Sequence, residues 1–264
     1  MGDSMNVKES YYNLKSMFNE SMTVELLTEP LQTCRLSDDA EEMQVLLEAA
    51  RFDHSGVVND QNEVIGYIDK ESLGKGYVES YIKPFKTTDL ISNSTSMIDL
   101  IYLFHERDVM FVLERNQITG IVTSADLHKH PVRLLAFSLI SILEMALLDE
   151  IKQVYRTEKE AIEQLPSSRS EMVYELYQER LKSNKDLKLL DNLQLADKGE
   201  LTKRTDEILE KCEFHSRNQC ERFFSDIEKV RNNIAHAQTY IGEDHNAIIR
   251  AIVDVNMVLK NLLG

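Results

Sequence analysis

The chain has 264 residues and a mass of 30.5 kDa, a length that fits one large domain or two of ordinary size. Hydrophobic residues make up 42% and charged residues 28%, which is typical of a folded protein and excludes a disordered chain. The 30 basic and 45 acidic residues leave a formal net charge of −15. Nucleic acids and anionic membranes are therefore repelled in general, so we expect no DNA or membrane partner, and an RNA site only as a local patch.

The three cysteines, Cys34, Cys212 and Cys220, form no CxxC pair and lack the spacing of metal ligands. So sparse a set predicts reduced intracellular thiols and no bound metal. The first ten residues have no apolar core, so no signal peptide is predicted. The longest apolar run, residues 134–148, is too short to span a bilayer and predicts a buried core helix. The expected location is the cytoplasm.

The first half of the chain contains an internal repeat. Residues 55–73 align with residues 110–127 at an offset of 54, which superposes Gly66 on Gly120. Each copy follows an amphipathic helical stretch and ends in a short helix start, so each unit predicts the order strand, helix, two-stranded hairpin, helix. The expected segments are an N-terminal extension over 1–21, a first unit over about 22–75 and a second over about 82–130, with the upstream helices at 38–51 and 96–105.

The second half, residues 131–264, shows no strand signal after Pro131. Its apolar periodicity predicts an all-α bundle of four or five helices. Residues 185–200 form a mixed segment that ends at Gly199. The expected fold class is therefore α+β, with two β-α-β-β-α units followed by a helical bundle. The helices are expected at 133–156, about 168–183, 202–212, 218–240 and 245–263.

The sequence GIVTSADL, residues 120–127, closes the second repeat. This run and the order of the elements resemble tandem CBS (cystathionine-β-synthase-like) domains, a pair called a Bateman module, over residues 22–130. The resemblance implies that an adenine nucleotide, AMP, ATP or a related one, binds between the repeats as a regulatory ligand. The hydroxyl of Thr123 and nearby N–H groups would meet a phosphate. The carboxylate of Asp126 would accept the ribose hydroxyls, and Gly120 would permit close backbone packing.

The first repeat departs from this pattern. Its matching residues are Gly66, Asp69 and Ser72. Asp69 places a negative charge where Thr123 places a hydroxyl, which would repel a phosphate. We therefore expect one ligand site at most, built on Thr123 and Asp126. The alternative is that this Thr-x-x-Asp run only caps a helix. Degenerate CBS pairs also serve as dimer platforms.

Residues 217–238 form a second candidate site on a predicted helix. An apolar stripe of Phe223, Ile227, Val230 and Ile234 marks its buried face.

Asn232 and His236 are four residues apart and point away from that stripe. Arg231 lies between the two faces, where it could pair with Glu228.

The sequence Arg231-Asn232-x3-His236 resembles the Arg-polar-x3-His motif of HEPN (higher eukaryote and prokaryote nucleotide-related) domains, over residues 132–264. In active members two copies of the motif meet in a dimer and cut RNA without metal. The resemblance implies attack by a ribose 2′-hydroxyl on the adjacent phosphate. His236 would transfer a proton. Arg231 would stabilise charge on the phosphate, and Asn232 would orient His236 or the phosphate.

The charge of this region weighs against RNA binding, because residues 203–231 hold seven basic and seven acidic side chains. Many HEPN domains also lack the activity. The leading hypothesis is a homodimeric, nucleotide-gated endoribonuclease of the kind used in microbial stress or antiviral defence. The first alternative is a non-catalytic regulator that binds a nucleotide and only dimerises or docks a partner. The second is a structural or antitoxin-type module in which neither site works.

Overall fold

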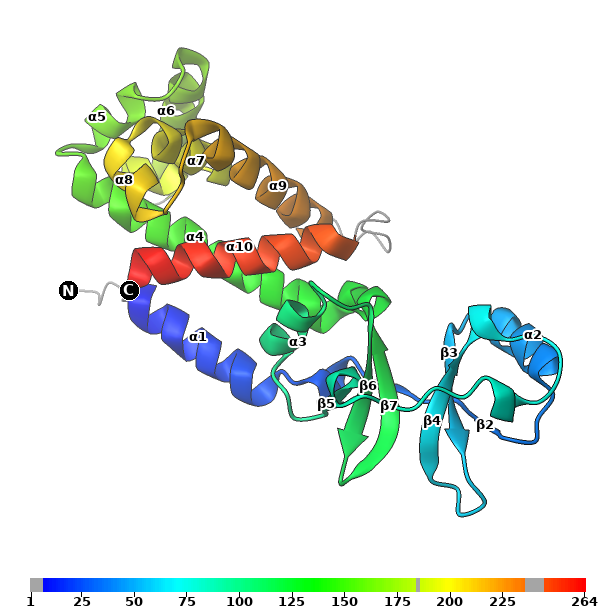
Figure 1. Ribbon diagram of the computed structural model, residues 1–264. Coiled ribbons are helices and arrows are strands. Elements are labelled where there is room, and N and C mark those ends of the chain that lie inside the picture. The colour runs from blue at the N-terminus through cyan, green and yellow to red at the C-terminus, as the bar shows by residue number, and fades with distance from the viewer. Residues whose placement is uncertain (1–6, 184–185, 236–244) are drawn as a thin grey trace. The chain divides into compact units, whose positions relative to one another are not determined.

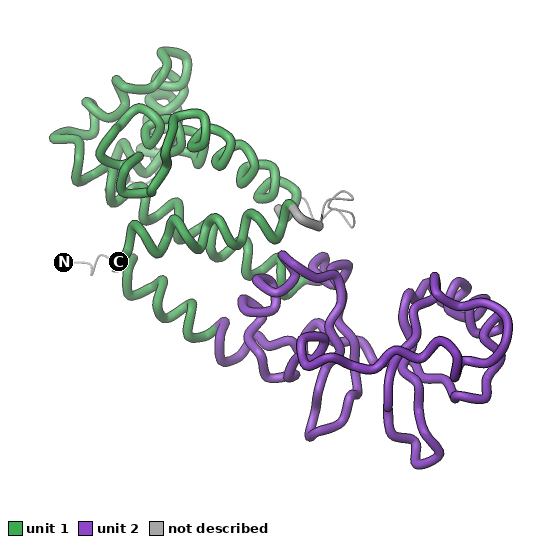
Figure 2. Tube along the Cα trace, in the orientation of Figure 1, with its two compact units in different colours: residues 1–17, 130–264 green, residues 18–129 purple. Residues whose placement is uncertain are grey.

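The computed structural model describes residues 7–183, 186–235 and 245–264. It forms two compact units, shown separately in Figure 2. The repeat unit comprises residues 18–129. The helical unit comprises residues 1–17 together with 130–264.

The N-terminal segment that the sequence set apart as an extension is helical in its described part. Helix α1 (Val7–Ser21) has its first turns in the helical unit. Tyr11 is buried there, and its hydroxyl donates a 2.8 Å hydrogen bond to Oδ1 of Asn256 near the end of the chain. Residues 7–17 therefore pack within the helical unit, whereas the end of α1 lies in the repeat unit.

The first repeat is built on a three-stranded sheet of order β2-β3-β4. Strands β2 and β3 are parallel, and β3 and β4 form an antiparallel hairpin with a bulge at Val57 and Val58. Helix α2 begins at Asp39 because this carboxylate accepts the N–H groups of Glu41 and Glu42. The bounds are β2 (Thr33–Arg35), α2 (Ala40–Ala50), β3 (His54–Val58) and β4 (Val64–Asp69).

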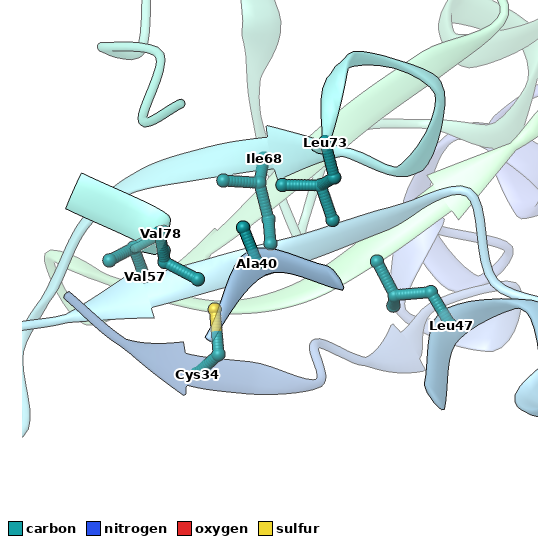
Figure 3. Packing of buried hydrophobic residues seen from close by; sticks show 7 residues of the cluster. All are labelled: Cys34, Ala40, Leu47, Val57, Ile68, Leu73 and Val78. Atoms are coloured by element: carbon teal, nitrogen blue, oxygen red, sulfur yellow. The ribbon is translucent and has the colours of Figure 1, made fainter. Parts of the chain in front are cut away.

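The core of this repeat lies between α2 and the sheet (Figure 3). Burial of these apolar side chains fixes which face of each strand points inward, because residues alternate between the two faces. The cluster consists of Cys34, Ala40, Leu47, Val57, Ile68, Leu73 and Val78.

The second repeat has the same order and an equivalent bulge, here between Val112 and Leu113. Ser96 caps its helix by accepting the N–H of Asp99. Both repeats end in a short 3-10 turn where the sequence predicted a helix start. The bounds are β5 (Leu90–Ser92), α3 (Met97–Leu103), β6 (Val109–Glu114), β7 (Gln117–Thr123) and the turns η2 (Lys70–Ser72) and η5 (Ser124–His128).

A strand from before the first repeat completes the second. Strand β1 (Glu29–Pro30) runs antiparallel to β7, with Glu29 opposite Ile121 and Pro30 opposite Gly120. The sheet order is thus β1-β7-β6-β5. The first repeat is therefore inserted between two parts of the second, an arrangement that the simple tandem division did not predict.

The helical unit is built on α4 (His130–Val154), which packs against α7, α8, α9 and α10. By length and composition α4 could cross a membrane, and 56% of its most apolar stretch is buried inside the structure. It has the burial of a core helix. The other helices are α5 (Glu158–Glu163), α6 (Ser167–Leu181), η6 (Leu189–Asn192), α7 (Leu195–Arg204), α8 (Asp206–Lys211), α9 (Arg217–Ala235) and α10 (His245–Leu263) (Figure 1).

Two sequence predictions for this half are wrong in detail. The expected helix over 202–212 is split between α7 and α8, because Thr205 has an extended backbone between them. The mixed segment that ended at Gly199 instead contains most of α7. A Cβ on Gly199 would lie 2.6 Å from the ring of Phe224, so this glycine lets α7 approach α9. Among the described residues the half holds α4 to α10, more helices than the bundle predicted.

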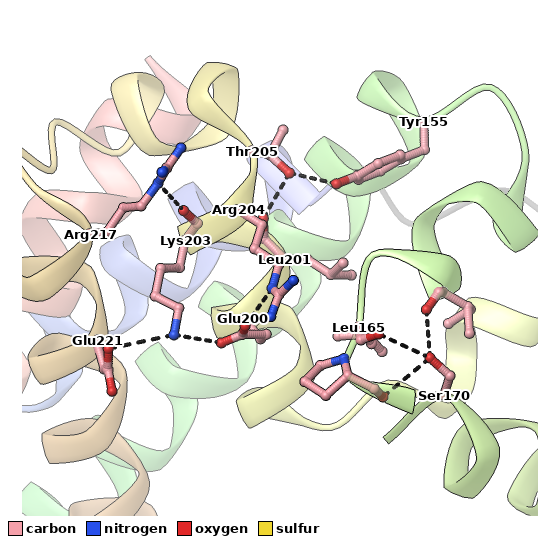
Figure 4. A network of polar contacts seen from close by, with 12 residues as sticks. Tyr155, Leu165, Ser170, Glu200, Leu201, Lys203, Arg204, Thr205, Arg217 and Glu221 are labelled. Atoms are coloured by element: carbon pink, nitrogen blue, oxygen red, sulfur yellow. Dashed lines mark hydrogen bonds and ion pairs between the residues drawn. The ribbon is translucent and has the colours of Figure 1, made fainter. Parts of the chain in front are cut away.

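Polar contacts tie α7 to its neighbours (Figure 4). The ammonium of Lys203 lies 2.7 Å from Glu200 and 3.5 Å from Glu221 of α9. Thr205, at the end of α7, lies 2.6 Å from the hydroxyl of Tyr155, which follows α4. These contacts hold the ends of three helices together.

Candidate functional site

The turn at the end of β7 brings Thr123 and Asp126 together. Oδ2 of Asp126 accepts hydrogen bonds from the backbone N–H of Thr123 at 2.7 Å and from its hydroxyl at 3.1 Å. Asp126 is buried, and its Oδ1 lies 2.9 Å from the ammonium of Lys129. The spacing in the sequence thus reflects a real contact, and the contact has the form of a helix cap.

Lys129 is an unpredicted member of this turn. Its ammonium also donates to the carbonyl of Leu27 at 2.6 Å and to the carboxylate of Glu29. Burial alone would lower the pKa of Lys129, but the hydrogen bonds to Glu29 and Asp126 outweigh it and raise the pKa. The three ammonium protons therefore all have acceptors. The helix-cap interpretation explains the turn as it stands, and the ligand role of Thr123 and Asp126 stays a prediction.

Gly120 has the packing role that its sequence position indicated. A Cβ at this position would lie 2.2 Å from Cγ2 of Thr28 and 3.1 Å from the carbonyl oxygen of Glu29. No side chain fits at such distances. The absence of a side chain therefore lets β1 pair with β7 directly above the Thr123 turn.

The equivalent turn of the first repeat has a different chemistry. Asp69 occupies the position of Thr123, and its carboxylate lies 2.7 Å from Nε2 of His54 and is also bound by the ammonium of Lys83. The hydroxyl of Ser72 donates to the carbonyl of Asp69 at 2.8 Å. These residues line a cavity of about 480 Å³ together with Asp53 and Glu71.

His54 and Lys83 both contact Asp69, and three carboxylates, those of Asp53, Asp69 and Glu71, line this cavity. The hydrogen bond that Lys83 donates to Asp69 raises the pKa of Lys83, so this lysine stays charged and neutralises Asp69. Lys70, which does not line the cavity, pairs with Asp53 at 2.8 Å. Asp69 and Asp53 are thus each paired with a lysine, and the unsuitability of the first turn for a phosphate stays a prediction.

Aromatic rings connect the two repeats. The ring of Phe111, on β6 of the second repeat, lies 4.7 Å from Tyr67 of the first repeat and 4.8 Å from Phe85 of the connection. The ring of His54 lies 6.2 Å from Phe111. His54 thus contacts both Asp69 of the first turn and Phe111 of the second repeat.

The motif on α9 is described only in part. Arg231 and Asn232 lie in the last turn but one of α9, and Asn232 is exposed. His236 lies outside the described residues, so its place relative to Arg231 stays a prediction. The buried face of α9 carries Cys220, Phe224, Ile227 and Val230, whereas Phe223 and Ile234 are only partly buried.

Arg231 is turned toward α4. Its guanidinium lies 3.1 Å from Oε1 of Glu144, and Oε2 of Glu144 lies 3.0 Å from the ammonium of Lys198. The partner of Arg231 is therefore Glu144 rather than Glu228. The Lys198 side chain is only 8% exposed, whereas that of Arg231 is 27% exposed. One carboxylate thus joins a buried lysine of α7 to an accessible arginine of α9.

Among the described residues, Cys212 and Cys220 are not activated thiols, and the acidic side chains form no metal-binding cluster. Burial is the main cause that raises the pKa of Cys212 and of Cys220 to about 12, so both thiols stay protonated. In the part of the chain that the structure describes, no three His, Cys, Asp or Glu side chains are placed to hold a metal ion.

The sequence matches no family model and no curated protein. Solved structures are similar to about two fifths of the chain. The CBS domains of a transcriptional regulator from Streptococcus pneumoniae share 20% identity, with 40% of this chain and 97% of that chain covered and a TM-score of 0.35. The CBS-pair protein CBSX2 from Arabidopsis thaliana shares 17% identity over 43% of this chain and 96% of that one, with a TM-score of 0.37. The same protein has been solved in complex with AMP, with a TM-score of 0.36.

Proposed function

We propose that the protein is a ligand-sensing regulator whose repeat unit binds an adenine nucleotide at the Thr123 turn. The observation that carries this proposal is that one turn gathers a hydroxyl, a carboxylate and an ammonium from Thr123, Asp126 and Lys129. These groups complement a ribose and a phosphate. An ionised carboxylate has about four acceptor positions, of which Asp126 uses three.

Nucleotide binding requires only a few hydrogen bonds of the turn to change partners. A ribose hydroxyl takes the remaining acceptor position of Asp126, or replaces the Thr123 hydroxyl on Oδ2. The hydroxyl of Thr123 then turns to a phosphate oxygen. The charge of Lys129 lies close enough to favour that phosphate. The helical unit passes the bound state to a partner protein or a second copy of the chain.

Calorimetric titration with AMP and ATP tests this proposal. AMP comes first because a structure similar to part of this chain holds it. We expect Asp126→Asn and Thr123→Val to weaken binding by about tenfold or more, because each removes a charge-assisted or hydroxyl contact. Ser72→Ala, at the equivalent place in the first repeat, is the matched control and leaves binding unchanged. Equal affinity in wild type and Asp126→Asn, with both proteins folded, would sink the proposal.

A second candidate function is metal-independent endoribonuclease activity of the helical unit, acting in a homodimer. The observation that favours it is that Arg231 remains partly exposed beside the exposed Asn232, so a phosphate can approach both. In this candidate His236 transfers the proton of the attacking 2′-hydroxyl and Arg231 stabilises the phosphate. Glu144 competes with the phosphate for Arg231, which makes activity dependent on opening that ion pair.

Incubation with tRNA and single-stranded RNA in EDTA, with and without AMP, tests the second candidate. Cleavage that survives EDTA and is lost in His236→Ala supports it, and Glu144→Gln should then cleave faster because Arg231 is released. Products should carry 2′,3′-cyclic phosphate ends. A folded wild-type protein that cleaves nothing under any condition leaves only the non-catalytic regulator.

A further inference from the structure

We propose that the space between α9 and α10 is a second ligand site, in the helical unit, for a free α-amino acid with an apolar side chain. A cavity of about 670 Å³ lies where α9, α10 and the connection after α8 meet. Figure 1 shows α9 and α10 diverging toward α8. Small-molecule sites in proteins occupy about 300–1,000 Å³, so this cavity is large enough. The inference goes beyond the nucleotide proposal and does not depend on it.

One part of the cavity wall is apolar. The ring of Phe214 is buried, and the ring of Phe223 lies 5.0 Å from it at 57°. Met257 of α10 completes this wall and is 52% exposed. An exposed thioether and a partly exposed aromatic ring that line one cavity offer apolar surface that a second apolar group would cover favourably. The side chain of the ligand belongs here.

The other part carries charges of both signs. Arg222 of α9 and Lys260 of α10 supply two cations, and Glu213 and Asp254 supply two carboxylates. Within the described ranges, neither Arg222 nor Lys260 forms an ion pair, and Nε of Arg222 donates a 3.4 Å hydrogen bond to the backbone carbonyl of Asn218. A third carboxylate, Asp226, is held by Lys229 at 3.0 Å.

The presence of both positive and negative side chains in the cavity determines which class of ligand fits. A nucleotide or a fatty acid brings only negative charge, which Glu213 would oppose, and a simple amine would be opposed by Arg222 and Lys260. An α-amino acid carries a carboxylate and an ammonium on one carbon. Its carboxylate would bind Arg222 and Lys260 while its ammonium binds Glu213, and these contacts are stronger than neutral hydrogen bonds.

The connection after α8, which lines part of the cavity, is fixed by hydrogen bonds. Glu213 has a left-handed backbone with φ of 59°, which ends α8, and the N–H of Phe214 donates to the carbonyl of Leu209 at 3.0 Å. The N–H of His215 donates to the side chain of Gln219 on α9 at 2.8 Å. A preformed wall of this kind binds a ligand with little ordering cost.

Three related probes test the proposal by calorimetry on the full-length protein. L-Phenylalanine has both charges, 3-phenylpropanoate lacks the ammonium, and 2-phenylethylamine lacks the carboxylate. We expect L-phenylalanine to bind once per chain and each analogue to bind at least about tenfold more weakly, because each loses a charge-assisted contact.

Two substitutions assign the charges. Arg222→Gln should weaken L-phenylalanine and 3-phenylpropanoate but not 2-phenylethylamine, and Glu213→Gln should weaken L-phenylalanine and 2-phenylethylamine but not 3-phenylpropanoate. Arg217→Gln, on the same helix outside the cavity, is the matched control and should change none of the three. Thermal unfolding of each variant confirms that it is folded.

Fluorescence provides a second measurement of binding, which works even when binding releases too little heat for calorimetry to detect. The sequence has no tryptophan, so Met257→Trp introduces a single tryptophan, which can be excited at a wavelength that the tyrosines do not absorb, into the cavity wall. Its emission should shift when L-phenylalanine is added. The proposal is wrong if no probe binds at millimolar concentration, if 3-phenylpropanoate binds as tightly as L-phenylalanine, or if Arg222→Gln and Glu213→Gln leave all affinities unchanged.

Discussion

The carboxylate of Glu144 lies 3.1 Å from the guanidinium of Arg231, and this pair joins the first helix of the second half to the helix with the candidate nuclease motif. The same carboxylate also holds Lys198 at 3.0 Å. Glu144 therefore pairs with two cations, one of them buried.

Glu144→Gln should destabilise the protein mainly through Lys198. Removing one member of a fully buried pair costs roughly 3–5 kcal/mol, and we expect about 2 kcal/mol here because Glu144 stays partly exposed. Urea unfolding measures the change. In the double variant Glu144→Gln, Lys198→Met no buried unpaired cation is left, because only the more exposed Arg231 has lost its partner, so much of the stability should return. A double variant as unstable as the sum of both single changes would show that the pair does not act as a unit.

Gly120→Ala should destabilise the repeat unit because its Cβ would lie 2.2 Å from Cγ2 of Thr28. Overpacking of this kind costs about 1–3 kcal/mol. Thr28→Ser removes the methyl group and keeps the hydroxyl that donates to the carbonyl of Val24 at 2.9 Å. The double variant Gly120→Ala, Thr28→Ser should recover part of the loss in thermal unfolding. If the stability does not recover, the contact of the new Cβ with the carbonyl of Glu29 accounts for the loss of stability.

Glu200 should make stability depend on pH in the acidic range. Burial alone would raise its pKa, but hydrogen bonds from Lys203 and Arg204 outweigh burial and lower the pKa below 4.5. The stability that this carboxylate contributes is therefore present above about pH 4.5 and is lost as pH falls through the folded value. Glu200→Gln should flatten the dependence of the unfolding free energy on pH below about pH 4.5. An unchanged pH dependence in Glu200→Gln would contradict this role.

The cysteines should be unreactive in the folded protein. All three are buried, and a pKa of about 12 leaves about one thiolate in ten thousand at pH 8 for Cys212 and Cys220. A disulfide reagent at pH 8 should therefore react only in denaturant. Lys229→Cys, at a site whose side chain is 69% exposed, provides the positive control and should react at once. Fast reaction of wild type without denaturant would contradict the burial of these thiols.

Local sequence patterns predicted much of the fold of the repeat unit, because its helices and hairpins are formed by residues close together in the chain. The helix expected at 38–51 is found as α2, and the alignment of Gly66 with Gly120 marks equivalent hairpins. The helical half was harder to predict. Gly199 suggested a helix end, since glycine weakens helices, yet its missing side chain is what the ring of Phe224 requires.

In the candidate sites too, the sequence pattern predicts contacts only between residues that are close together in the chain. Thr123 and Asp126 could be paired from their spacing alone, because three residues separate them. Glu29 and Lys129 are a hundred residues apart, and Glu144 and Arg231 are separated by 87, so no local pattern brings either pair together. Such contacts depend on the register of β1 on β7 and on the packing of α4 against α9.

The position of β1 has a consequence for the order in which the chain folds. The sheet of the second repeat is not complete until Glu29 meets Ile121, with the whole first repeat lying between them. Closing so long a loop is entropically costly and slow, whereas β2, β3 and β4 are close neighbours in the chain. On a ribosome, the first repeat can therefore fold while the second is still being synthesised, and the waiting strand β1 is captured last.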